Sequence, residues 1–189
     1  MTMKTSKFVN EIIDRYAKDE ELKRLLIVHS ANVARKALDV ADNCGLGDRV
    51  DRQFVWDASM LHDIGIVACD APSIHCHGHL PYIRHGIAGA EILRKEGLGE
   101  DFCRVCERHT GSGILASEIE AQGLPLPVKD YVPETIEEKL ICYADKFFSK
   151  SGDPVREKTL ERVEASMRRH GPEPLERFMK LHRLFSASE

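Results

Sequence analysis

Leu61-His62-Asp63-Ile64-Gly65 is the most informative segment of this sequence. It closes an upstream run of apolar residues at three- and four-residue spacing, a pattern that predicts a helix. Two adjacent polar side chains therefore lie at the end of this helix, and the glycine lets the backbone turn away. A His-Asp pair often arises by chance, so its meaning depends on the polar residues that other helices bring to it.

Three further predicted helices carry a histidine or an aspartate on an apolar face. They are a helix over about 19–43 with His29, a short one from about 102 that ends at His109, and one with Asp145 that opens on the capping-box pattern of Thr135 and Glu138. One such histidine is more often a satisfied core residue than a ligand. Several imidazoles and carboxylates need a shared partner, because each is costly to bury alone, and a metal ion satisfies both types.

The rest of the chain shows the same helical periodicity. Apolar residues recur at helical spacing over about 6–17, 51–62, 85–97, 155–170 and 174–185. No period-two pattern and no internal repeat is found, so we expect an all-α fold, a single-domain helical bundle over residues 1–189. Two long connections, 66–83 and 111–133, are rich in Gly, Pro or His, and we expect them to form walls of a site.

In this order the elements resemble the HD-domain superfamily, whose pattern is a histidine on one helix, a His-Asp pair closing another and an aspartate on a later helix. His29, His62-Asp63 and Asp145 match that order, and residues 62–65 look like the family's HDIG variant. The segments that begin at His85 and His109 are similar to the two additional histidine segments of its dinuclear branch. The resemblance covers about residues 25–150, the expected HD-domain core, and leaves 151–189 as C-terminal helices.

The resemblance implies a metal centre in which Asp63 bridges two ions and serves as the catalytic carboxylate. One ion is then held by His29, His62, Asp63 and Asp145, and the second by Asp63, His85 and His109. The expected cofactor is a divalent transition metal, as one ion or two, and the two last histidines decide between these cases. Imidazole and carboxylate ligands suit iron, manganese, zinc, nickel or cobalt, and the resemblance favours iron or manganese.

Such a centre predicts a metal-dependent phosphohydrolase that cleaves a phosphate ester or anhydride of a nucleotide or small phosphorylated metabolite. The nucleophile is a metal-bound water, so no side-chain nucleophile is needed. Lys146 and Arg84, each next to a predicted ligand in sequence, are candidates for binding the substrate's phosphate oxygens. The Gly-Tyr-Pro signature of enzymes that split cyclic dinucleotides is missing, which disfavours that activity. Residues 153–156 are similar to a segment of the dinucleoside polyphosphate hydrolases, but lie further from Asp145.

Three alternatives stay open. HD-fold proteins resembling myo-inositol oxygenase hold a mixed-valence diiron centre with the same six ligands, so the reaction could be an oxygenation. A non-catalytic nucleotide-binding module is expected to lack ligands, and all six are present. A separate zinc site could combine the histidines at 75, 77 and 79 with Cys103, Cys106 and His109, although both cysteines fit a helical pattern typical of buried core thiols.

Composition and charge limit the partners. The chain has 189 residues, a net charge of −4 and no concentrated basic run, so a nucleic-acid duplex is not an expected partner. No apolar run approaches the roughly 20 residues of a membrane span, and the N-terminus lacks a signal-peptide pattern. We therefore expect a cytoplasmic protein with no membrane contact, six reduced cysteines and a small phosphorylated substrate. A homodimer is left open.

Overall fold

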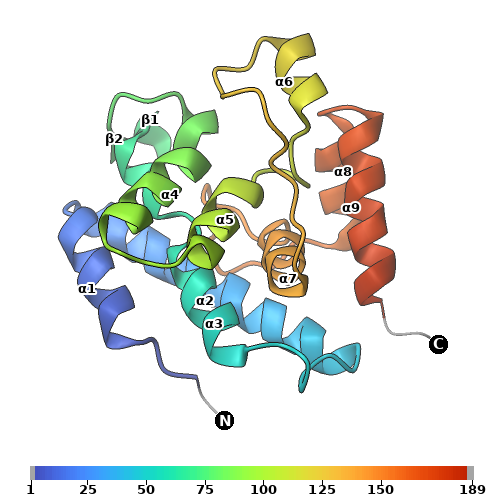
Figure 1. Cartoon of the computed structure of the whole chain (residues 1–189), viewed down its shortest axis with the longest axis horizontal. Helices are drawn as coiled ribbons and strands as arrows, with labels where there is room; N and C mark the ends of the chain where they lie inside the picture. Colours follow the sequence, from blue (N-terminus) through green and yellow to red (C-terminus); the bar gives the residue numbers. More distant parts are fainter. Residues whose placement is uncertain (1–2, 187–189) are drawn as a thin grey trace.

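The computed structural model describes residues 3–186, and its helices follow the predicted order (Figure 1). They are α1 (Lys7–Tyr16), α2 (Glu20–Asn43), α3 (Arg52–Leu61), α4 (His85–Lys95), α5 (Glu100–Arg108), α6 (Ala116–Gln122), α7 (Ile136–Asp145), α8 (Leu160–Arg168) and α9 (Pro172–Phe185). The all-α class is confirmed. No helix within these residues has the length and apolar character needed to cross a membrane.

The longest helix, α2, packs against α3 and α7 (Figure 1). Its apolar residues, among them Leu26 and Val33, are buried. Its first turn is capped by the side chain of Asp19, which accepts a hydrogen bond of 2.8 Å from the Leu22 amide. α3 begins in the same way, with Asp51 accepting from the Phe54 amide at 2.9 Å. His29 lies on the buried face of α2, so the packing of the bundle places its imidazole in the interior.

The two long connections contain short elements that the sequence did not reveal. The first holds the 3-10 turns η1 (Ile64–Ala68), η2 (Pro72–Ile74) and η3 (Tyr82–Arg84), with strands β1 (Asp70–Ala71) and β2 (Cys76–His77) paired antiparallel between them. Strands of two residues have no periodicity to detect, and this sheet is too small to alter the fold class. The second connection contains α6, whose one buried residue is Ile119 and which therefore has no apolar stripe.

Close packing around α4 depends on two glycines. A Cβ atom on Gly65 would overlap the carbonyl oxygen of His85 and the amide nitrogen of Gly89. A Cβ atom on Gly86 would lie 2.6 Å from the carbonyl oxygen of Cys106. The backbone of α4 therefore packs directly against η1 and α5, and this close approach brings the first residue of α4 up to the His-Asp pair.

The C-terminal helices α8 and α9 pack together at one side of the bundle (Figure 1). The predicted break between them is confirmed, with Gly171 at φ 120° and Pro172 as the first residue of α9. α8 begins at Leu160 rather than near 155. Tyr143 on α7 stacks on Phe178 of α9, with ring centroids 5.6 Å apart, and this contact fixes α9 against the core.

The start of α7 is held by a buried carboxylate. Glu138 accepts hydrogen bonds from the Glu134 amide at 2.8 Å, from Arg104 at 2.9 Å and from Arg108 at 3.0 Å. Its own amide donates to Thr135 Oγ1 at 3.2 Å, which is one half of the predicted capping box. The other half differs, because the carboxylate of Glu138 accepts from the amide of Glu134 and not from that of Thr135. Burial alone raises the pKa of Glu138, but these donors outweigh it and lower the pKa below its usual 4.5.

Replacing Glu138 by glutamine should lower the free energy of unfolding by roughly 2–3 kcal/mol at pH 7, because two charge-assisted bonds are lost. A lowered pKa stabilises the folded state above the unfolded pKa, and that stabilisation is lost as pH falls through the folded value. The difference between wild type and variant should therefore shrink as pH falls below about 4.5. Urea unfolding of both proteins between pH 7 and pH 3 measures this difference in the free energy of unfolding. Glu137→Gln, on the same turn, should show no such difference.

Candidate metal centre

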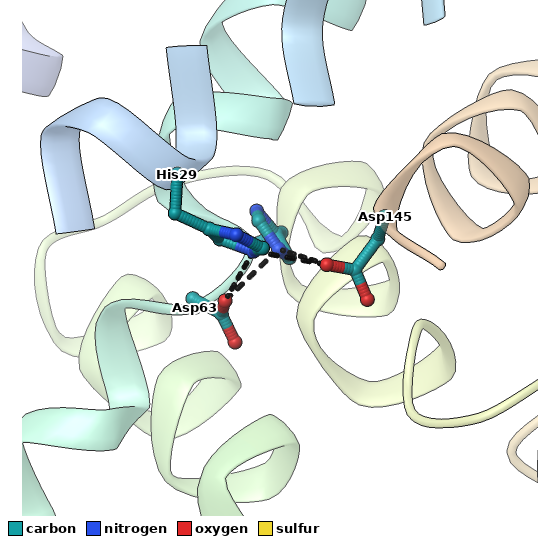
Figure 2. A group of neighbouring side chains, drawn as sticks. His29, Asp63 and Asp145 are labelled. Atoms are coloured by element: carbon teal, nitrogen blue, oxygen red, sulfur yellow. Dashed lines mark hydrogen bonds and ion pairs between the residues drawn. The ribbon is translucent and has the colours of Figure 1, made fainter. Parts of the chain in front are cut away.

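Six buried histidine and aspartate side chains meet where five helices converge. His29 lies in α2, His62 and Asp63 follow the last residue of α3, His85 opens α4, His109 follows α5 and Asp145 ends α7. Each is no more than 6% exposed. Figure 2 shows the side chains of His29, Asp63 and Asp145 converging from their separate elements. Five of the six lie at or beside a helix end, where a short turn of backbone sets their direction.

The two oxygens of Asp63 face different partners. Oδ2 lies 3.2 Å from His29 Nε2 and 3.1 Å from His62 Nε2, and these two nitrogens also lie 2.9 and 3.4 Å from Asp145 Oδ1. Oδ1 lies 3.2 Å from His109 Nε2 and 3.6 Å from His85 Nε2. The site thus has two halves, with four residues on one side, three on the other and Asp63 in both.

Three of the histidine rings are anchored in the same way, through Nδ1 to the backbone carbonyl three residues earlier. The pairs are His62 with Ser59 at 2.6 Å, His85 with Tyr82 at 2.7 Å and His109 with Cys106 at 2.8 Å. A carbonyl can only accept, so each Nδ1 carries a proton, and in the neutral ring Nε2 carries the lone pair. This is the arrangement in which an outer hydrogen bond orients a metal-ligating imidazole.

The donor set fits a divalent cation. His85 Nε2 and His109 Nε2 lie 3.0 Å apart, so two lone pairs face each other with no proton between them. His62 Nε2 and Asp63 Oδ1 are buried with no hydrogen-bond partner among residues 3–186. Buried polar atoms without partners are costly, and a cation bound to these nitrogens and oxygens removes the cost.

The surroundings of the site set the charges of its groups. Burial raises the pKa of Asp63, but the charges of His62 and Lys150 outweigh it and hold the pKa well below its usual range. Burial and the neighbouring His109 lower the pKa of His85 to about 3, so this imidazole is neutral at pH 7. Burial also lowers the pKa of His62, but Asp63 and Asp145 raise it to about 9. A metal at His62 therefore displaces a proton.

The six residues predicted as ligands are the same six that the structure brings together, and their role as ligands stays a prediction. The alternative zinc site does not form within residues 3–186, because no cluster of ligand atoms there contains Cys103 or Cys106. Both cysteines are buried in the core. His75 and the histidines at 77 and 79 are exposed on the connection that contains β1 and β2.

The two cations predicted to bind phosphate lie in different settings. Lys146 Nζ is 2.7 Å from Asp145 Oδ2 and donates to the carbonyl oxygen of His109 at 2.9 Å. Within residues 3–186, no hydrogen bond or ion pair joins the side chain of Arg84 to any of the six residues, and its Nε is buried without a partner. The role of both in binding phosphate stays a prediction.

Sequence reasoning missed a third cation, Lys150. Its Nζ lies 2.7 Å from Asp63 Oδ2, although the residue follows α7 in a segment without helical pattern. A lysine in a loop is usually solvated, so no signal in the sequence distinguishes this one.

Comparisons with known proteins give this site its family context. Residues 26–149 match the HD domain family. A tRNA (cytidine(56)-2'-O)-methyltransferase of Picrophilus torridus is 42% identical over 132 residues, which are 70% of this chain and 34% of that protein. The protein of the same name from Thermoplasma volcanium is 35% identical over 162 residues, 85% of this chain and 42% of that protein. An uncharacterized protein of Methanocaldococcus jannaschii is 43% identical over 99 residues, 52% of this chain and 51% of that protein.

Solved structures give a second line of comparison. The HD domain of the L. monocytogenes phosphodiesterase PgpH matches with a TM-score of 0.54 and 18% identity, over 95% of this chain and 86% of that one. The same domain in complex with cyclic-di-AMP matches equally well, over 87% of its chain. At this identity the likeness concerns the fold. The chain spans about a third to a half of the length of the curated relatives it matches.

The family match covers more than half of the chain, from the second turn of α2 to the segment after α7. Together with the buried cluster of histidines and aspartates, it indicates divalent-metal binding. The chain belongs to the HD domain family.

Proposed function

We propose that the chain is a phosphohydrolase that cleaves a phosphate ester or anhydride of a nucleotide or small phosphorylated metabolite. One observation carries the proposal: the two oxygens of a single buried carboxylate, Asp63, face two separate sets of ligand nitrogens. Two divalent ions held there, with iron or manganese proposed, would supply a bound water of pKa near 7 and positive charge for the phosphoryl oxygens.

The chain's own residues divide the remaining work. Asp63 and Asp145 are proposed to hold the ions in place, and their burial keeps bulk water away from the reacting groups. A cavity of about 380 Å³ adjoins His85 and has a mainly apolar wall, formed in part by Tyr82 and Met167. Tyr82 also stacks on His85, with ring centroids 4.7 Å apart. This wall favours a substrate with a flat apolar group such as a nucleobase.

Methylation of tRNA is the second candidate, because two relatives carry the name of a tRNA methyltransferase. The chain matches only 34% and 42% of those proteins, so most of their length lies outside the match. The net charge of −4 does not favour binding a polyanion, and a buried set of six ligands has no evident use in transferring a methyl group. We therefore infer that the matching part is a metal-binding unit, distinct from the methyl-transfer chemistry.

The test is metal analysis followed by a substrate panel. Protein purified anaerobically with iron or manganese should contain two ions per chain and release phosphate from some esters or anhydrides. His109→Ala should reduce the content to one ion per chain. The activity of this variant should fall by more than about a hundredfold. Loss of an outer-shell partner of a metal ligand already costs up to about that much, and His109 is predicted to be a ligand itself. Cys103→Ala, on the same helix, should keep both ions and the activity.

Each competing function has its own readout in the same preparation. Methylation of a tRNA transcript by S-adenosylmethionine would favour the second candidate. Oxygen uptake by the iron-loaded protein without phosphate release would favour the oxygenase. Less than one ion per chain after metal supply would contradict the proposed centre, and loss of metal in Cys103→Ala would show that the ligand set is wrong.

A further inference from the structure

Lys150 connects the surface of the molecule to the metal centre. Its side chain is 16% exposed and lines two clefts, of about 440 and 330 Å³, that also share Ser73 and Ile74. Its ammonium lies 2.7 Å from Asp63 Oδ2. Within residues 3–186 none of the six predicted ligands lines either cleft, so Lys150 is the residue that links the clefts to the site.

The neighbouring cations already have partners. Lys146 pairs with Asp145 and donates to a backbone carbonyl, and its side chain is only 9% exposed. Lys158 donates to the carbonyl oxygens of Lys146 and Phe148, at 3.3 and 3.1 Å, and so supports the loop rather than the site. Lys150 differs, because its ammonium pairs with Asp63 at 2.7 Å and donates to no backbone carbonyl among residues 3–186.

The oxygen that Lys150 contacts also indicates its role. Asp63 Oδ2 is the oxygen that faces His29 and His62, so the ammonium lies at the four-residue half of the site. A counter-ion for the carboxylates is not needed once a divalent ion is bound, since the ion supplies that charge itself. The ammonium is then free to meet the anion that the ion attracts. An ammonium is a compact point charge on a flexible stem, well suited to a phosphoryl oxygen.

We propose that Lys150 binds a non-bridging phosphoryl oxygen of the substrate, next to the ion held by His29, His62, Asp63 and Asp145. This inference rests on the proposed phosphohydrolase function. It assigns the contact to the segment that follows α7, in which sequence analysis named Lys146 but not Lys150.

Binding of inorganic phosphate to the manganese-loaded protein tests this role without relying on turnover. Lys150→Met should weaken phosphate affinity, measured by titration calorimetry, by about 10- to 100-fold, the effect expected from losing one hydrogen bond to a charged group. The metal content should stay at two ions per chain. Lys150→Arg should recover part of the affinity because it keeps the charge. Lys129→Met, which removes an exposed lysine paired with Glu107, should bind phosphate like wild type.

The possible results distinguish failure of the Lys150 role from failure of the phosphohydrolase function. If wild type binds phosphate and Lys150→Met binds it equally well, Lys150 has no role at the phosphoryl group and the inference is wrong. The same holds if the variant loses metal and the remaining loaded fraction keeps wild-type affinity, because Lys150 would then support the ligands only. If metal-loaded wild type neither binds phosphate nor cleaves any ester or anhydride, the proposed function fails first, and this inference fails with it.

Discussion

Asp63→Asn is expected to remove both ions and abolish activity. The amide keeps the size of the carboxylate but loses its charge and one of its two acceptor oxygens, so it cannot serve both halves of the site. Without bound metal, the pKa of the attacking water rises from about 7 towards that of bulk water, and we expect the rate to fall by roughly a thousandfold or more. Metal analysis of the purified variant, with phosphate release on the best substrate, gives both readouts.

Asp57→Asn is a matched control for this change. Asp57 lies in α3, the helix that precedes Asp63, and its carboxylate is also buried, at 3% exposed. It accepts hydrogen bonds from the amide of Ser6 and from the side chain of Gln53, and not from residues of the site. The same substitution there should lower stability and leave two ions per chain. Retention of both ions by Asp63→Asn, with a normal circular dichroism spectrum, would contradict the bridging role.

Gly65→Ala is expected to have the largest effect on the fold. The added methyl group would overlap backbone atoms of His85 and Gly89 and lie 2.8 Å from Gly89 Cα, and backbone cannot rotate away as a side chain can. Overpacking in a core costs about 1–3 kcal/mol, and we expect the upper end or more here. For a chain of this size that corresponds to a fall in Tm of roughly 10 °C.

The same substitution should also affect metal binding, because α4 must move away from η1 and takes His85 with it. Metal analysis of the folded fraction should show loss of the ion on the three-residue side. Gly47→Ala is the matched control, since its methyl group would meet only the ends of the flexible side chains of Asp42, at 2.5 Å, and Arg52, at 3.5 Å. A Gly65→Ala protein with wild-type Tm and two ions would show that α4 does not depend on this contact.

The helical architecture could be predicted from the sequence because its signals are local. The caps at Asp19, Asp51 and Thr135 lie at the positions where the apolar periodicity begins, and each accepts the expected amide hydrogen bond. The six predicted ligands were visible because each sits on an apolar face or next to a helix end, where a polar residue conflicts with the pattern. Polar residues are rare on apolar faces because burying them is costly, and this rarity identifies the six residues in the sequence.

Other features of the fold and of the site could not be predicted, because they depend on tertiary contacts. Lys150 reaches Asp63 through a tertiary contact, and its loop has no periodicity against which a lysine would stand out. α6 has a single buried residue, Ile119, and is tied to α9 by an ion pair between Glu118 and Arg177, so its stability comes from a distant element. The backbone overlap at Gly65 likewise depends on where α4 packs, which one segment of sequence cannot specify.

The carbonyl anchors of His62, His85 and His109 have a consequence for how this centre can evolve. Each ring is oriented by a main-chain oxygen, which every amino acid supplies, so the hydrogen bond itself requires no particular residue type at positions 59, 82 and 106. Sequences can therefore diverge widely at these three positions while the imidazoles keep their direction. The three hydrogen bonds that orient the rings depend on the helical turns of the backbone. Substitutions that keep these turns therefore keep the hydrogen bonds.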